Sequence, residues 1–344
     1  MNLNDTVAGI VAIDESVRLE ALQLQAGLAK PPNALGRLET FGVQLAAIAG
    51  ACPPPLPDPA RIVVVGGDHG VVDQGVTRWP AALSGVLAGT VVQGVAGVSV
   101  LAASAGVQVR MLDAGLAAEV PGVPAEVIRR GSGDFTVGAA LGADEVIAAL
   151  ELGIRQAELA FDEGVRCLAT GEVGIGNTTA AAALIASFTG ASAEVVAGRG
   201  ADSPPEMVAV KASVIARGLA LHRPDAADPL GVLAAFGGVE QAVLAGLVLG
   251  AARLRIPVLL DGVTGVAAGL AAVALAPAAS GYLIAAHAGA EPGIAVGLQA
   301  LGLKPVLDLD LALGEGTGAA LAIPILRAAS AVMSEMATLA SLLG

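Results

Sequence analysis

Short runs of consecutive apolar residues alternate along most of the chain with longer segments rich in alanine and leucine. The short runs are rich in β-branched residues and bounded by glycine, which is typical of buried parallel strands, whereas the longer segments have helical character. This alternation predicts repeated β-α units around a mainly parallel sheet. The predicted strands lie in segments 61–70, 107–115, 165–176, 256–265, 281–289 and 304–316.

The first fifty residues have a helical pattern. Asp14 precedes a run of leucines and valines that ends at two prolines, and a second short helix is expected over residues 35–49. The proline-rich segment 52–60 should be a stiff connector, because proline fixes its own φ and donates no hydrogen bond. This connector is the best candidate for a domain boundary. A terminal helix is expected over residues 328–343.

The composition narrows the class of protein. With 344 residues, of which 55% are hydrophobic, the chain can bury a large core. Its formal charge of -13 argues against nucleic acid and membrane surfaces as partners, since both are negative, and favours small molecules. The two cysteines, Cys52 and Cys167, form no C-x-x-C motif, and there are only three histidines. We therefore expect no metal site, no disulfide framework and a reducing, cytoplasmic setting.

Targeting and membrane segments are not expected. The N-terminal stretch is acidic and has no basic region followed by an apolar core, so it does not resemble a signal peptide. Segments 79–109 and 262–286 lack charge and are long enough to span a bilayer. However, they consist mostly of alanine, glycine and valine broken by polar residues and proline, which indicates strand, turn and helix instead.

Polar side chains follow almost every predicted strand. In open α/β sheets, ligands bind at the carboxyl ends of the strands, so these side chains are expected to converge on one crevice. The residues concerned are Asp68, His69, Asp113, Glu172, Asp261, His287 and Glu315.

The segment GEVGIGNTTAAAALI, residues 171–185, passes from a strand through a glycine turn into an alanine-rich helix. Unpaired N–H groups at such a helix start suit a phosphate, and glycines such as Gly174 and Gly176 allow close approach. An ordinary N-cap by Asn177 or Thr178 is the alternative. The segment has no Gly-Lys-Ser/Thr, so it is not a Walker A motif.

Two further polar motifs have both functional and structural interpretations. In GGDHGV, Asp68 and His69 could form a catalytic pair, but adjacent side chains usually point apart, which favours a role in fixing the loop. In the segment 198–220, Asp202 lies in a glycine-rich turn and Lys211 on the following helix. Lys211 could reach a phosphate as a point charge, although most helix lysines are solvated.

Glu315 lies between Gly314 and Gly316, just before an apolar helix. A solvated loop position, or an interaction with the dipole of that helix, would keep the pKa of its carboxyl low. Burial against apolar side chains would raise that pKa and make the carboxylate a better base. The sequence leaves these alternatives open.

Taken together and in order, these motifs resemble the nicotinate-nucleotide:dimethylbenzimidazole phosphoribosyltransferase family over nearly the whole chain. GEVGIGNTT and LGEGTGAA are the most specific matches. The other matching segments are KPPNALGRLE (residues 30–39), GDHGV, GRGADS, AHAGAEPG (residues 286–293) and the long stretch from LGLKP to IPIL.

The resemblance implies transfer of phosphoribose from nicotinate mononucleotide to 5,6-dimethylbenzimidazole, without a metal or other cofactor. It implies a Rossmann-like sheet with helices on both faces in a large catalytic domain, residues 60–321. A small helical domain would combine residues 1–59 and 322–344, and the protein would be a homodimer. Glu315 takes the place of the family's general base. Glu172 matches the acidic residue of the ribose and phosphate site.

The chain also departs from the family pattern. Thr77 replaces a serine, and Val86 aligns with a glutamine that helps to hold the base, so recognition of the base is expected to differ. Segment 286–294 has lost two serines, an arginine and a histidine. A noncatalytic nucleotide-binding or regulatory homologue is therefore the alternative function. An NAD-linked dehydrogenase is disfavoured because GGDHGV does not supply a G-x-G-x-x-G turn.

Overall fold

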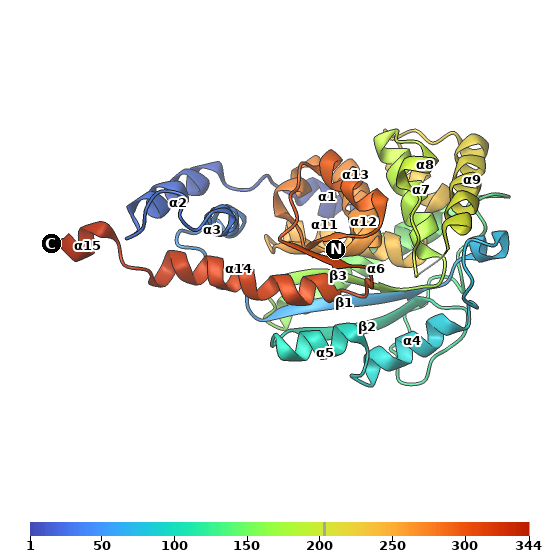
Figure 1. Cartoon of the computed structure of the whole chain (residues 1–344), viewed down its shortest axis with the longest axis horizontal. Helices are drawn as coiled ribbons and strands as arrows, with labels where there is room; N and C mark the ends of the chain where they lie inside the picture. The colour runs from blue at the N-terminus through green and yellow to red at the C-terminus, as the bar shows by residue number, and fades with distance from the viewer. Residues whose placement is uncertain (202–203, 344) are drawn as a thin grey trace.

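The computed structural model describes residues 1–201 and 204–343. Its centre is a five-stranded sheet in the order β2-β1-β3-β4-β5, in which all neighbouring strands are parallel (Figure 1). A separate parallel pair is formed by β6 and β7. The strands span Ala60–Gly67 (β1), Gln108–Gly115 (β2), Cys167–Val173 (β3), Val258–Leu260 (β4), Leu283–Ala285 (β5), His287–Gly289 (β6) and Leu307–Leu311 (β7). The predicted α/β class and parallel sheet are confirmed.

Helices cover both faces of the sheet because alternate residues of its strands point to opposite sides. In β1, Val63 and Val65 join one hydrophobic cluster, whereas Ile62 and Val64 join the other. The first cluster includes side chains of α6 (Ala143–Asp162), α7 (Asn177–Thr189), α11 (Val239–Arg253) and α12 (Gly262–Leu275). The second includes side chains of α4 (Leu83–Val92), α5 (Gly97–Ser104) and α14 (Thr317–Glu335).

Close packing of α6 against α11 depends on two glycines. A Cβ at Gly153 would overlap the carbonyl oxygen of Val243, and one at Gly246 would overlap that of Leu150. The two backbones therefore approach directly. The main body also contains α8 (Ala193–Val196), α9 (Pro205–His222), α10 (Pro229–Phe236), α13 (Pro292–Leu301) and the 3-10 turns Gly70–Gln74 and Pro277–Tyr282.

A helical arm extends away from the sheet and holds the C-terminal end of the described chain (Figure 1). It is formed by α2 (Glu15–Gly27), α3 (Arg37–Ala49), the second half of α14 and α15 (Leu339–Leu343). A small cluster that includes Ala21, Val43 and Met333 holds the arm together. Helix α1 (Leu3–Gly9) packs instead on α6 and α11 of the main body. The division at residues 59/60 and 321/322 stays a prediction.

The predicted helices near the two termini differ in how well they agree with the structure. Asp14 caps α2, since one of its side-chain oxygens accepts hydrogen bonds from the backbone N–H groups of Ser16 and Val17. The predicted terminal helix over residues 328–343 is helical in two parts and not as one element: α14 begins earlier and ends at Glu335, and α15 follows from Leu339. The chain leaves the helix there because Ala337 O accepts a hydrogen bond from Ala29 N at 2.8 Å.

The segment 281–289, predicted as one strand, forms two strands in different sheets. Ala286 lies between them and bonds to both sides: its N–H donates to Leu260 O at 3.0 Å, and its carbonyl accepts from Leu307 N at 3.1 Å. The chain thus crosses from β5 in the main sheet to β6 beside β7. This crossing brings His287 to the carboxyl edge of the main sheet.

Within the described residues, two helical stretches are long and apolar enough to cross a membrane by length and composition alone, Leu83–Ser104 and Thr317–Glu335. Core helices of globular proteins meet the same criterion. In α14, Ala319, Ala322 and Ile323 are completely buried and belong to the cluster on one face of the sheet.

Candidate active site

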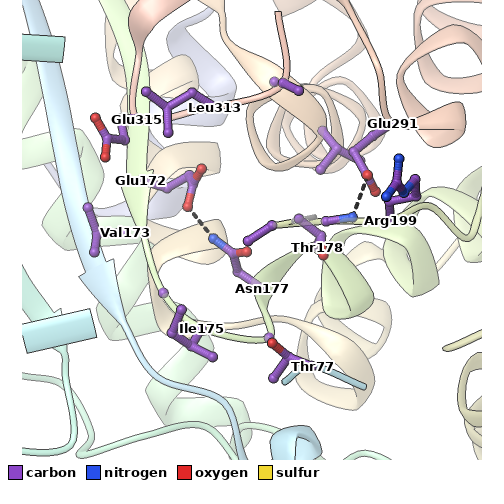
Figure 2. Close-up of a pocket in the computed structure, with 18 of the residues that line it drawn as sticks. Thr77, Glu172, Val173, Ile175, Asn177, Thr178, Arg199, Glu291, Leu313 and Glu315 are labelled. Atoms are coloured by element: carbon purple, nitrogen blue, oxygen red, sulfur yellow. Dashed lines mark hydrogen bonds between the residues drawn. The ribbon is translucent and has the colours of Figure 1, made fainter. Parts of the chain in front are cut away.

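A cavity of about 640 Å³ lies at the carboxyl ends of the strands, a size that suits a small-molecule ligand. Residues far apart in the sequence line it (Figure 2). Glu315 and Leu313 lie at one end, and Thr178, Arg199 and Glu291 at the other. The lining residues that were predicted from the sequence are Thr77, Glu172, Gly174, Gly176, Asn177, Thr178, Lys211, His287, Gly314 and Glu315.

Glu315 is held in an unusual turn. Its φ is +62°, and those of Gly314 and Gly316 are +83° and +108°, so three consecutive residues have positive φ. A non-glycine residue rarely adopts this conformation, which indicates that the surrounding structure imposes it. Glu315 is 8% exposed, and its Oε2 accepts a hydrogen bond from Val98 N at 3.3 Å. Burial raises the pKa of Glu315, and the hydrogen bond from Val98 N–H lowers it. The net shift is upward because burial has the larger effect.

The start of α7 faces the cavity. Its N-cap is Gly176, at φ +94°, and no side chain of the described residues caps it. The alternative of an ordinary cap by Asn177 or Thr178 is therefore wrong. Asn177 Nδ2 donates instead to Glu172, and Lys211 Nζ donates to Thr178 Oγ1 at 3.3 Å. A helix start with a lysine beside it can bind an anion.

Lys211 is a buried cation, 3% exposed, so it is not one of the usual solvated helix lysines. Burial lowers the pKa of Lys211, and the charge of Glu291 acts in the opposite direction. Glu291 Oε1 accepts a hydrogen bond from Gly200 N at 2.6 Å, which ties the loop before α9 to the start of α13. Asp202, predicted as a further binding residue in that loop, lies outside the described residues.

Glu172 is the last but one residue of β3 and lies between the two ends of the cavity (Figure 2). Burial, with a contribution from the Glu240 carboxylate, raises the pKa of Glu172 to about 8, although the backbone N–H of Glu315 opposes the shift. The carboxyl group of Glu172 is therefore largely protonated at neutral pH. It can donate a hydrogen bond as well as accept one.

Asp68 does not line the cavity but lies behind its wall. One carboxylate oxygen accepts a hydrogen bond from the Ser84 hydroxyl, and the other accepts from Ala117 N at 2.8 Å. Ser84 Oγ in turn accepts a hydrogen bond from Ile175 N at 2.9 Å. Asp68 therefore braces the glycine turn before α7 and is not placed to contact a ligand.

His69 likewise lies outside the cavity lining. Its Nε2 is 2.9 Å from Glu240 Oε1, and both side chains are fully enclosed. Burial disfavours the charged ring, but Glu240, with smaller contributions from Asp68 and Glu172, outweighs burial and raises the pKa of His69. This geometry supports the loop-fixing interpretation of GGDHGV. Gly316 also faces away from the cavity, since its N–H donates to Asp261 Oδ2.

Residues 10–342 match a family model described as Phosphoribosyltransferase. The chain belongs to this phosphoribosyltransferase family. Among its relatives, the nicotinate-nucleotide--dimethylbenzimidazole phosphoribosyltransferase of Salinispora tropica is 48% identical, with 98% of each chain covered. The protein of the same name from Chloroflexus aggregans is 44% identical, with 98% of this chain and 96% of the relative covered.

Solved structures give the same relationship. The crystal structure of nicotinate-nucleotide-dimethylbenzimidazole phosphoribosyltransferase from Thermus thermophilus has a TM-score of 0.90 and 39% sequence identity to this chain. The match covers 96% of this chain and 98% of the Thermus chain. The α/β architecture is therefore that of the family, and the resemblance found in the motifs is confirmed.

Several lining residues of this phosphoribosyltransferase family member were not predicted. Leu83 and Leu87 line the cavity from α4, whereas Val86, expected near the base, is 62% exposed and absent from the lining. The i, i+4 spacing of Leu83 and Leu87 could have indicated from the sequence that both lie on one face of a helix. Trp79 also lines the cavity, and its Nε1 donates to Ala201 O at 2.9 Å. No sequence pattern singled it out.

Proposed function

We propose that this chain transfers the 5-phosphoribosyl group of nicotinate mononucleotide to 5,6-dimethylbenzimidazole or a related base. The products are α-ribazole 5′-phosphate and nicotinate. The names of its relatives support this activity. The observation that carries the proposal is that Glu315 lines the same cavity as Lys211 and the uncapped start of α7.

The phosphate end of the donor fits the end of the cavity around Thr178. Lys211 supplies a positive charge there, and the first turn of α7 supplies backbone N–H groups and the positive end of its dipole. Gly174 and Gly176 also line the cavity, but a Cβ at either position would overlap Gly67 O or the Val72 side chain, so packing of the chain requires glycine there. A single phosphate can be held in this way by charge-assisted hydrogen bonds.

The accepting base fits the apolar end. Side chains of Leu83, Leu87 and Leu313 line the cavity there, together with Val173 and Ile175. A flat bicyclic ring with methyl substituents buries well against such a surface. Thr77 supplies a hydroxyl nearby, whereas Val86 contributes no contact.

The chemistry needs one proton acceptor. One nitrogen of the base attacks the anomeric carbon, and the bond from that carbon to the pyridinium nitrogen of nicotinate breaks. The electron pair of the broken bond neutralises the pyridinium, so the leaving group needs no acid. The second nitrogen of the base loses its proton, and the Glu315 carboxylate accepts it as general base. The cavity also holds donor and acceptor with their reacting atoms aligned, and this alignment supplies the rest of the rate enhancement.

Glu172 has a different role in this scheme. As a largely protonated carboxyl between the two ends of the cavity, it adds little negative charge beside an anionic donor. It can donate a hydrogen bond to a ribose hydroxyl while accepting one from Asn177. Before the proton is transferred, Glu315 is thus ionised whereas Glu172 is largely protonated.

The proposal includes a cytoplasmic homodimer. The family resemblance in the sequence supports the dimer, and the reducing setting inferred from the two unpaired cysteines supports the location. Sedimentation equilibrium with the purified protein tests the first point. A monomeric mass across the micromolar range would contradict it.

The activity is tested by incubating the purified protein with nicotinate mononucleotide and 5,6-dimethylbenzimidazole and measuring nicotinate release by chromatography. The Glu315→Gln variant should lose about 10²- to 10⁴-fold in kcat, the usual contribution of a general base. Asp308→Asn, the same change at an exposed carboxylate on β7, is the matched control and should be unaffected. Donor binding without turnover of any base would favour the noncatalytic alternative.

A further inference from the structure

A buried pair, Asp261 and His287, lies directly behind the Glu315 turn. Asp261 follows β4 and is 2% exposed, and His287 begins β6 and is 3% exposed. His287 Nε2 is 3.6 Å from Asp261 Oδ1, within ion-pair distance but too long for a hydrogen bond. Among the described residues, neither ring nitrogen of His287 has a hydrogen-bond partner. The scheme for phosphoribosyl transfer gives neither residue a role.

The Asp261 carboxylate holds the start of α14. Although Asp261 is at the N-cap position of α12, its side chain makes no cap there. Its Oδ2 accepts from Gly316 N at 3.0 Å, and its Oδ1 accepts from Ala319 N at 2.8 Å. Asp261 therefore caps a helix that is distant in the sequence and begins at Thr317, two residues after Glu315. The bond to Gly316 fixes the peptide that adjoins Glu315.

This attachment accounts for the conformation of Glu315. A glutamate at φ +62° costs free energy that the surroundings must supply. The hydrogen bond that Gly316 N donates to the buried Asp261 carboxylate stabilises this turn, because charge-assisted bonds exceed neutral ones. Without it, the turn could relax and the carboxylate would leave the end of the cavity next to Leu313.

His287 is the nearby partner of the buried Asp261 carboxylate. Isolating a charge from water is costly unless a partner offsets it. Among the described residues, His287 is the basic side chain within ion-pair distance of Asp261. The ring fits closely because residue 318 is glycine: a Cβ there would overlap the ring and lie 2.9 Å from Asp261 Oδ1. The charge of Asp261 also contributes to the raised pKa of the neighbouring Glu172 carboxyl group.

We propose that Asp261 and His287 are positioning residues that act as one unit. Asp261 holds the Glu315 turn through the Gly316 and Ala319 amides, and the His287 ring packs beside the Asp261 carboxylate and keeps it in place. The inference rests on the proposed function only in that Glu315 is taken as the base. The attachment of the turn to Asp261 can be measured without any reaction.

The kinetic test replaces Asp261 by asparagine, whose single carbonyl oxygen can serve only one of the two amides. We expect kcat to fall about 100-fold, the effect of roughly 1 Å of misplacement, while KM for nicotinate mononucleotide stays within about 2-fold. In the Glu315→Gln background the same change should have almost no further effect, since the two residues act as a unit. Equal losses in both backgrounds would overturn the proposal.

His287 is tested with a conservative pair. His287→Gln keeps a polar side chain beside the Asp261 carboxylate, whereas His287→Leu replaces it with an apolar one. We expect the glutamine variant to retain most of kcat and the leucine variant to lose about 10-fold or more. Equal activities would refute the role of His287. If Asp261→Asn does not fold, this pair still decides the kinetic question.

Hydrogen exchange gives the readout that is independent of activity. In the unliganded protein, Asp261→Asn and His287→Leu should accelerate amide exchange in residues 314–320, while Asp308→Asn should not. If Glu315→Gln proves fully active, the assignment of the base fails, but this exchange measurement still reports whether Asp261 holds the turn. Unchanged exchange in both variants would overturn the proposal itself.

Discussion

Val98 N donates a hydrogen bond to Glu315 Oε2 at 3.3 Å across 217 positions of sequence. The donor lies in the first turn of α5, so the Glu315 carboxylate is held at the positive end of that helix. This contact favours the ionised carboxylate, whereas burial favours the protonated one. The balance between them sets the pH at which the carboxylate can accept a proton.

The pH profile of the reaction should report this balance. Burial raises the pKa of Glu315 above its usual 4.5, and a general base must be ionised, so activity should fall with decreasing pH at a higher pH than a solvated glutamate would give. The measurement is kcat/KM between pH 4.5 and 9. If the same acid limb appears in the residual activity of Glu315→Gln, another group is responsible for it.

Replacing Lys211 should weaken binding of the donor. Hydrogen bonds to charged groups contribute about 1.5 to 3 kcal/mol, so Lys211→Met should raise Kd for nicotinate mononucleotide about 10- to 100-fold. The chain has one tryptophan, Trp79, and it lines the cavity, so its fluorescence can follow the titration. Arg217→Met, at an exposed cation on the same helix, is the matched control. Equal affinities in the two variants would place the phosphate elsewhere.

Glu172 should make the protein less stable as pH rises. Its pKa is about 8 in the folded protein and near 4.5 in the unfolded chain. Between these values the folded state keeps a proton that the unfolded state has lost, so the free energy of unfolding decreases with increasing pH, by up to a few kcal/mol. Thermal unfolding of wild type and Glu172→Gln at pH 5 and pH 8 checks this. The variant should gain in Tm relative to wild type at pH 8, and a constant difference would argue against the shift.

A glycine substitution tests the packing of His287. Gly318→Ala places a Cβ against the His287 ring and should lower the free energy of unfolding by about 1 to 3 kcal/mol, as overpacking does. Gly27→Ala, at the end of α2, meets no atom within 4 Å and is the control. That substitution should be neutral or slightly stabilising. Urea unfolding measures both, and equal midpoints would show that the ring yields without cost.

Much of the fold could be predicted from the sequence because each strand is a short apolar run between glycines. The run 281–289 was predicted as one strand because apolar composition does not specify which neighbour each residue pairs with, and Ala286 bonds to two different strands. The end of α14 could not be predicted for a similar reason. The contact that stops the helix, between Ala29 and Ala337, joins residues from opposite ends of the chain.

The strand-end rule located the cavity but did not assign each side chain. Glu172, His287 and Glu315 line the cavity. Asp113 lies behind the wall and pairs with Arg130 at 2.6 Å. The rule gives the edge of the sheet at which a residue lies, whereas the direction of its side chain depends on partners distant in the sequence. The pKa of Glu315 was open for the same reason, since burial is a property of the whole fold.

Helix α14 connects the helical arm with the proposed catalytic turn. Its 19 residues extend over about 28 Å, with the Glu315 turn at one end and Met333 in the arm cluster near the other. Pro324 interrupts the hydrogen-bond ladder of this helix, so a displacement of the arm would reach Glu315 through two helical halves joined at Pro324. A molecule that bound to the arm would thus change the position of the Glu315 carboxylate without entering the cavity.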